Sequence, residues 1–478
     1  MNSILYTPKF QTSGYADVTE DVSLPDYIPE MRRVVGVRAC CTVDGKYMAG
    51  DGLEVDGSVT YTVLYSGGDG SLAQVSQTTP YTGKLPVQDD VQPGESVVWA
   101  NAEQISCRVT APRKITLSSR VRLGAMAQNG TDASMKCGDK GDVRRKNRSV
   151  STAFLKEVRT SGEASGEIRE KEGTRVIMAS AEIAVGDVRV GAPAGRITVK
   201  GDVYLNALSV SPDGGTVISR SRVPVEDTFP MSDRADPASC RAAAFGTITL
   251  IEVDAGDDGV MQWRAEYDMD CDIMETAECV IAEDAYTVGY EDELTARTSD
   301  CCTPAGCVNG RLTVSGTSKL RPGTGFLTAW GTVGGEKCSV KNGRLNVEGV
   351  VKLECITAGE GETFTDEVQI PLRYECEAFP GAADCDAPSA RVRAVITDVS
   401  ARPEGDMLNL TAELAIGAAA LGKQPVTYVD SVSRKSPLNE KKNLLRVYIP
   451  DEGESGWDVE KRFRLKEEAK PEGRAYVI

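Results

Sequence analysis

The chain contains no histidine among its 478 residues. Histidine is the side chain that most often transfers protons near neutral pH, so its absence excludes Ser-His-Asp and Cys-His catalysis and histidine general bases. It also excludes every zinc site that needs an imidazole ligand. Carboxylates, lysines and cysteines remain, but none of them forms a recognisable catalytic pattern. The sequence therefore predicts a protein that is not an enzyme and that binds no metal ion or cofactor.

Long apolar runs and an excess of positive charge are also missing. No apolar run approaches the ~20 residues that a membrane-spanning helix needs, and the weakly polar stretch Ala415–Leu421 is far too short. The first residues, Met1–Tyr6, lack the basic start and apolar centre of a signal peptide. The 71 acidic residues exceed the 54 lysines and arginines, and the resulting net charge of −17 repels phosphate groups. We therefore expect cytoplasmic synthesis, no membrane span and no nucleic-acid partner.

The 14 cysteines include no Cys-x-x-Cys pair, so the common zinc-ribbon and thioredoxin motifs are absent. Three cysteines share one side of an expected strand with apolar neighbours and are predicted to be buried: Cys107, Cys271 and Cys355. Adjacent strand residues face opposite ways, so Cys40–Cys41 and Cys301–Cys302, together with Cys307, fit a buried core less easily. An exposed thiol of this kind would be available for cross-linking; a cysteine-only metal site is the less favoured alternative.

A Val-x-Gly-x-Val motif occurs three times at nearly constant spacing, centred on Gly57, Gly201 and Gly349. Three further features follow each glycine in register. A hairpin-type turn comes first, at Gly67–Gly70, Pro212–Gly215 and Gly359–Gly361. A proline that a central strand would not tolerate comes next, at Pro80, Pro224 and Pro371. A second turn completes the set, at Ala111–Arg113, Ala255–Asp258 and Arg402–Gly405. Four features in register indicate a triplicated unit.

The fold class follows from strands that alternate apolar and polar residues, such as 103–110, and from the turns between them. We predict a mainly β protein of three repeated antiparallel β-sandwich-like domains. The polar segments 129–151 and 422–438 are expected to be solvated connections, and the acidic run Glu291–Glu293 to be solvated surface. The remaining tail differs in pattern: a strand at 445–450, a short helix capped by Ser455 and a closing strand at Ala475–Ile478.

The segment Asp17–Glu30, followed by Val63-Leu64-Tyr65, resembles the SPOCS domain of clostridial sporulation and spore-coat proteins. The second and third repeats resemble it through the Val-x-Gly-x-Val core, the turn and the proline. The resemblance implies SPOCS-like repeats at 1–135, 150–282 and 286–425.

The tail resembles a LysM module, whose opening Tyr and Gly-Asp-Thr-Leu-Trp pattern corresponds to Tyr448 and to Gly453 through Trp457. Pro450, Gly456 and Glu460 depart from the usual pattern, and too few residues remain for a second helix. The resemblance implies a shortened α+β module at 446–478. Its partner- or glycan-binding residues would be Gly453, Glu454, Ser455, Trp457, Asp458 and Arg462. Trp457 can equally be the core aromatic of so small a module.

Together the two resemblances imply a non-catalytic structural or adaptor protein of spore-coat or spore-envelope assembly. Its partners would be coat or morphogenetic proteins, bound through the β repeats and the LysM-like tail, with self-assembly as a further mode. It would be made in the mother-cell cytoplasm and localise to the forespore surface or spore coat. The alternative is a protein that binds peptidoglycan or N-acetylglucosamine oligomers through the LysM-like tail.

Overall fold

The computed structural model describes residues 3–50, 52–68, 70–87, 96–137, 142–191, 195–231, 236–256, 258–359, 362–438, 447–468, 471–472 and 475–477. Strands make up 81% of the structure and helical residues 3%. The strands form several separate antiparallel sheets, and the described residues contain one short α-helix, near the C-terminus. The prediction of a mainly β fold is confirmed.

The same arrangement of six strands occurs three times along the chain. Unit 1 contains β1 (Ile4–Ser23), β2 (Met31–Ala49), β3 (Gly52–Gly67), β4 (Leu72–Pro86), β5 (Ser96–Ala111) and β6 (Lys114–Asp132). Unit 2 contains β8 (Val143–Arg169), β9 (Arg175–Val190), β10 (Arg196–Val210), β11 (Thr216–Pro230), a 3₁₀ turn η2 (Pro237–Ser239), β12 (Cys240–Ala255) and β13 (Val260–Thr287). Unit 3 contains β14 (Tyr290–Lys319), β15 (Gly325–Lys341), β16 (Arg344–Gly359), β17 (Glu362–Glu377), β18 (Ser389–Glu404) and β19 (Met407–Pro437).

In each unit the second, third and fourth strands form one sheet, with the third in the middle. The first, last and fifth strands form the other sheet, with the last in the middle. The two sheets pack face to face around a buried apolar core. The short strand β7 (Lys136–Cys137) adds in parallel to β19.

The three motif glycines lie in the central strands β3, β10 and β16, between valines that point into the core. In each unit the neighbouring strand carries a β-bulge beside this glycine. The bulge brings backbone so close that a Cβ on Gly57 would lie 2.0 Å from the carbonyl oxygen of Thr42, and one on Gly201 would lie 2.6 Å from that of Ala184. In units 1 and 2 the glycine is therefore a packing requirement of the bulged sheet.

The three prolines lie in the edge strands β4, β11 and β17, as expected of a residue without a backbone donor. Each faces the residue that follows the motif glycine: Pro80 pairs with Ser58, Pro224 with Asp202 and Pro371 with Val350.

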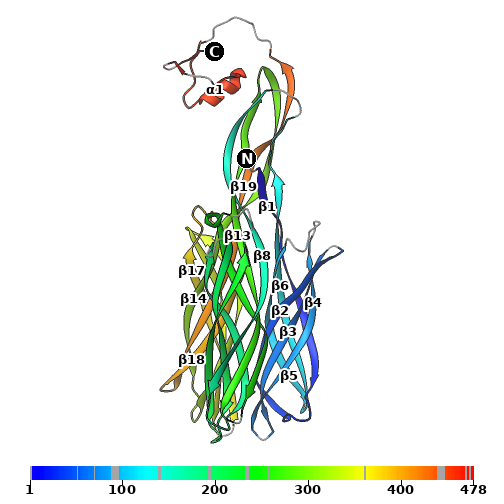
Figure 1. Cartoon of the computed structure of the whole chain (residues 1–478), viewed down its shortest axis with the longest axis vertical. Helices are drawn as coiled ribbons and strands as arrows, with labels where there is room; N and C mark the ends of the chain where they lie inside the picture. The colour runs from blue at the N-terminus through cyan, green and yellow to red at the C-terminus, as the bar shows by residue number, and fades with distance from the viewer. Residues whose placement is uncertain are drawn as a thin grey trace.

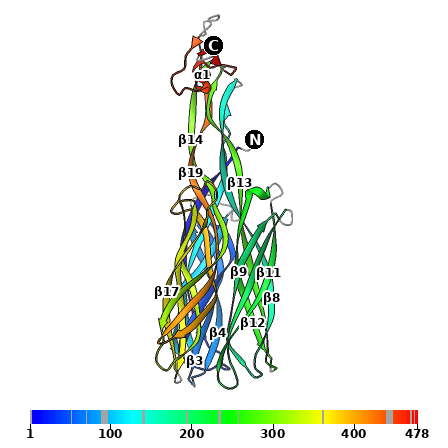
Figure 2. The ribbon, with the colours of Figure 1, turned by 90° about the vertical axis from the view of Figure 1, so that its left-hand side faces the viewer.

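The three units pack around a common centre. Leu64, Leu208 and Ile356 occupy the same position relative to the motif glycine, and all three belong to one buried apolar cluster. Their side chains point away from the core of their own sandwich, so each unit buries an outer sheet face against the other two. In Figures 1 and 2 the strands of all three units run along the long axis of an elongated body.

The segments 129–151 and 422–438, expected to be connections, are largely strands instead. Unit 2 begins with β8 at Val143 rather than at 150, and β19 continues to Pro437, beyond 425. The outer ends of β8, β13, β14 and β19 form a narrow projection at one end of the body (Figure 1). A thin projection exposes more of each strand to solvent than a sandwich does, and the sequence there is correspondingly polar.

The tail contains β20 (Val447–Tyr448), α1 (Gly456–Phe463), β21 (Pro471–Glu472) and β22 (Ala475–Val477), with the sheet order β20-β22-β21. Ser455 caps α1 through a capping box with Asp458, as the sequence indicates. Within the described residues, α1 is far too short to cross a membrane, and no other helix is long and apolar enough to do so.

Candidate functional site

The six predicted binding residues lie together at the tip of the projection, in and before α1 (Figure 1). Gly453 occupies a turn with φ +90°. Glu454 accepts a hydrogen bond from the hydroxyl of Tyr448 at 2.6 Å and pairs with Arg462 at 3.1 Å. Ser455 and Asp458 cap the helix. Four of the six residues therefore hold the module itself together.

Trp457 points toward the body of the protein. Its indole N–H donates to the Oδ2 atom of Asp284 at 2.9 Å, and its ring centroid lies 5.2 Å from that of Tyr286. Lys461, one turn further along the helix, pairs with the Oδ1 atom of Asp284 at 2.5 Å. Burial alone would raise the pKa of Asp284, but the bonds from Lys461 and Trp457 outweigh it and lower the pKa.

Further contacts fix the end of α1 to the hairpin between β13 and β14. Arg464 pairs with Asp292 at 2.9 Å, and the hydroxyl of Tyr286 donates to the carbonyl oxygen of Leu465 at 2.7 Å. Arg144 of β8 donates to the carbonyl oxygen of Lys466 at 3.1 Å. The side chain of Asp292 is only 2% exposed, so the expectation of solvated surface for Glu291–Glu293 is wrong at its central residue. The tail therefore buries the carboxylate of Asp292, which the local sequence predicts to be solvated.

The opposite side of the module faces solvent. Val447 of β20 is 64% exposed and Ile449 is 71% exposed, which is unusual for large apolar side chains. β20 is also an edge strand of its small sheet. Asp458 and Arg462, on the solvent side of the helix, are exposed as well. We call Val447 and Ile449 the outward surface of the module; like the exposed charges Asp458 and Arg462 on α1, they are accessible to a partner.

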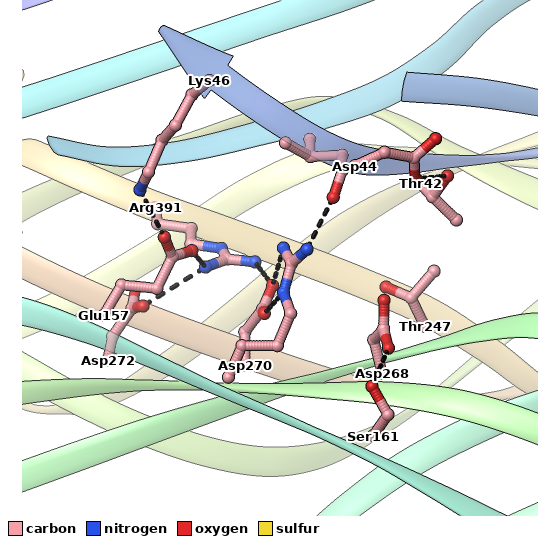
Figure 3. Close-up of polar contacts among 12 residues, drawn as sticks. Thr42, Asp44, Lys46, Glu157, Ser161, Thr247, Asp268, Asp270, Asp272 and Arg391 are labelled. Atoms are coloured by element: carbon pink, nitrogen blue, oxygen red, sulfur yellow. Dashed lines mark hydrogen bonds and ion pairs between the residues drawn. The ribbon is translucent and has the colours of Figure 1, made fainter. Parts of the chain in front are cut away.

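A second cluster, which the sequence does not predict, joins the three units inside the body (Figure 3). Arg391 of β18 is its centre, with a side chain only 5% exposed. Its guanidinium donates to Asp270 at 2.5 Å, to Glu157 at 2.8 Å and to Asp272 at 3.2 Å. The guanidinium carbon Cζ of Arg391 lies over the ring of Phe245, 4.4 Å from its centroid.

The charges around this centre come from units 1 and 2. Arg159 of β8 pairs with Asp270 at 2.5 Å and donates to the backbone oxygen of Val43. Lys46 of β2 pairs with Glu157 at 2.9 Å. We call these six residues the junction cluster: Lys46, Glu157, Arg159, Asp270, Asp272 and Arg391. Because strands β2, β8, β13 and β18 all contribute, the cluster depends on the three units being packed together.

The sequence contains a weak signal for this cluster. Asp270 and Asp272 alternate with Met269, Cys271 and Ile273, whose side chains enter the core of unit 2. The aspartates therefore lie on the outer face, which for a single sandwich would be solvated. In the folded chain that face lies against units 1 and 3.

All 14 cysteines are free thiols; seven of them are buried, six are half-buried and Cys137 is exposed. Cys271 and Cys355 are buried as predicted, and Cys107 is half-buried. Cys301 and Cys302 are both buried and Cys307 is half-buried, so this pair lies in the core although adjacent strand residues face opposite ways. Cys301 packs in an apolar cluster with Leu5, Cys279 and Tyr428, and Cys302 on the other side of β14 is 2% exposed, so both faces of the strand are covered at this point. Burial raises the pKa of Cys41 and of Cys302 to about 12, which disfavours the reactive thiolate.

Metal-ligand geometry is not found among the described residues, where no three cysteine or carboxylate side chains gather as a metal site would require. Comparison with family models, curated proteins and solved structures finds no match for this chain. The class that the fold defines is a mainly β protein of three packed six-stranded units with a small module at one tip.

Proposed function

We propose that this chain is a non-catalytic structural or adaptor protein of spore-coat or spore-envelope assembly, which binds protein partners through the module at its tip. The supporting observation is the position of that module. It is anchored to the body by Trp457, Lys461 and Arg464, and it turns Val447 and Ile449 outward. Exposed apolar residues on a fixed support are typical of protein-interaction surfaces.

The resemblance to SPOCS and LysM sequences supports the spore-coat setting. On this proposal the protein is made in the mother cell and localises to the forespore surface, where coat or morphogenetic proteins bind it. Glycan binding is less favoured because Trp457, the aromatic most suited to stacking on a sugar, is already engaged by Asp284 and Tyr286.

The test compares three fluorescently tagged chains in sporulating cells: the full chain, a truncation that ends at residue 438, and the double variant Val447→Asp/Ile449→Asp. We expect the full chain to gather at the forespore and both altered chains to remain dispersed. The double variant leaves every anchoring contact of α1 in place, so it isolates the outward surface from the folding of the module. Normal localisation of the truncated chain would contradict the proposal. Retention on purified peptidoglycan that Trp457→Ala abolishes would favour the glycan alternative.

A further inference from the structure

The junction cluster contains one carboxyl group that its neighbours do not satisfy. Asp272 is 0% exposed, and its Oδ1 atom receives a single hydrogen bond of 3.2 Å from Arg391. Its Oδ2 atom has no hydrogen-bond partner within the described part of the chain. An ionised carboxylate in such a position loses hydration that nothing replaces, which is costly.

The guanidinium of Arg391 donates to three carboxylates, and its hydrogen bond to Asp272 is the longest of the three. The Nη1 atom of Arg391 that reaches Asp272 also donates to Glu157 at the shorter distance of 2.8 Å. Asp270 takes the Nη2 atom at 2.5 Å.

The other two carboxylates each have a second cation. Glu157 pairs with Lys46 and Asp270 with Arg159, whereas among the residues that the structure describes Asp272 forms an ion pair with Arg391 alone. Asp272 is therefore the carboxyl group whose charge is least compensated.

The remaining titratable groups near Asp272 do not supply the missing charge. Cys271 lies beside it on β13 and Cys307 faces it from β14. Burial raises the pKa of both thiols, so they remain neutral. On β12, the residue paired with Asp272 is Ala243, which carries no charge.

We propose that Asp272 is a proton-binding site at the junction of the three units, and that proton uptake there holds the units together more tightly in mildly acidic solution. Burial is the largest influence on Asp272; Arg391 opposes it, Glu157 and Asp270 add to it, and the resulting pKa is raised to about 7. Protonation removes the least compensated of the buried negative charges, and Arg391 continues to pair with Glu157 and Asp270. This inference does not depend on the proposed function.

The sign of the effect follows from linkage. The ordinary pKa of an aspartate is 3.8, and that of Asp272 in the folded chain is about 7. Between these values the folded state holds a proton that the unfolded state has released. This site therefore raises the unfolding equilibrium constant up to about tenfold per pH unit as the pH increases, and its effect levels off above about pH 7.

The test compares the wild type with Asp272→Asn, whose neutral amide mimics the protonated acid. Urea unfolding is followed by circular dichroism from about pH 5 to about pH 8. In this range carboxylates with ordinary pKa values contribute equally to the pH dependence of both proteins, so their contributions cancel in the comparison. We expect the ratio of the unfolding constants, wild type over variant, to rise about tenfold per pH unit up to about pH 7 and then to flatten. Asp268→Asn is the matched control, because Asp268 lies on the same strand and accepts a bond from Ser161 at 2.7 Å; its ratio should not show this rise. A flat ratio for Asp272→Asn would overturn the proposal.

Infrared spectroscopy gives a second readout that needs no unfolding. The wild type at about pH 6 should show a protonated carboxyl stretch that is absent from Asp272→Asn and is lost from the wild type at about pH 9. Asp272→Ser replaces the asparagine variant if the latter does not fold. Identical carboxyl bands in the wild type and the folded variant would contradict proton binding at Asp272.

Discussion

The indole N–H of Trp457 donates to the carboxylate of Asp284, a residue 173 positions earlier in the chain, at 2.9 Å. The same carboxylate pairs with Lys461. One acidic residue at the hairpin tip therefore holds both an aromatic and a basic residue of α1. This contact decides which way the module faces, and so leaves Val447 and Ile449 as its accessible apolar surface.

Replacing Asp284 by alanine should release the module from the projection. The change removes two hydrogen bonds to a charged group, and we expect docking to weaken by about 1.5–3 kcal/mol. Hydrogen exchange of the α1 amides should accelerate accordingly. Glu283→Ala is the control, because Glu283 is adjacent but pairs with Lys146 on the exposed side at 3.4 Å. Equal exchange rates in the two variants would show that Asp284 is not the anchor.

Docking of the module should depend on pH in the acid range. The pKa of Asp284 is lowered in the folded chain from its ordinary 3.8, so its contribution is complete above that value and is lost as the pH falls through the lowered pKa. We expect α1 to remain docked at about pH 5 and to separate only when the pH falls below the ordinary aspartate value of 3.8. The fluorescence difference between the wild type and Trp457→Phe reports the change. A difference spectrum that is the same at both pH values would argue against this linkage.

Gly57→Ala should destabilise unit 1 markedly. The added Cβ would lie 2.0 Å from the carbonyl oxygen of Thr42, so the bulged strand must move. Overpacking of this kind costs about 1–3 kcal/mol, measurable by urea unfolding. Gly349→Ala should cost less, because its nearest atom, the carbonyl oxygen of Gly334, is 3.3 Å away. Gly68→Ala, with nothing within 4 Å, serves as control.

Arg391→Met should weaken the packing of all three units together. The variant leaves the buried carboxylates without their shared cation, and losing one partner of a buried pair typically costs about 3–5 kcal/mol. We expect a large fall in the thermal midpoint. Arg311→Met removes a half-exposed partner of Asp202, which retains Arg222, and should change the midpoint little. Similar thermal midpoints for the two variants would show that Arg391 does not hold the three units together.

Much of the fold could be predicted because it rests on local signals. Alternation of apolar and polar residues reports which side of a strand is buried, and the motif glycines and edge prolines report where a strand sits in its sheet. Ser455 likewise indicated the beginning of α1 through its capping hydroxyl. These features depend on neighbours within a few residues or on one adjacent strand.

The sequence by itself thus determined the β class, the threefold repetition and the capped helix of the tail. Only the tertiary structure decided what covers the outer faces of the sheets. Cys302, Asp272 and Asp292 look exposed when each strand is considered alone, yet all three are buried by residues far away in the chain. Period-two alternation describes a strand with one covered face, so it carries no information about a second layer that arrives from another unit. Asp272 of the junction cluster and Asp292, which anchors the module through Arg464, both lie on strand faces that such a second layer covers.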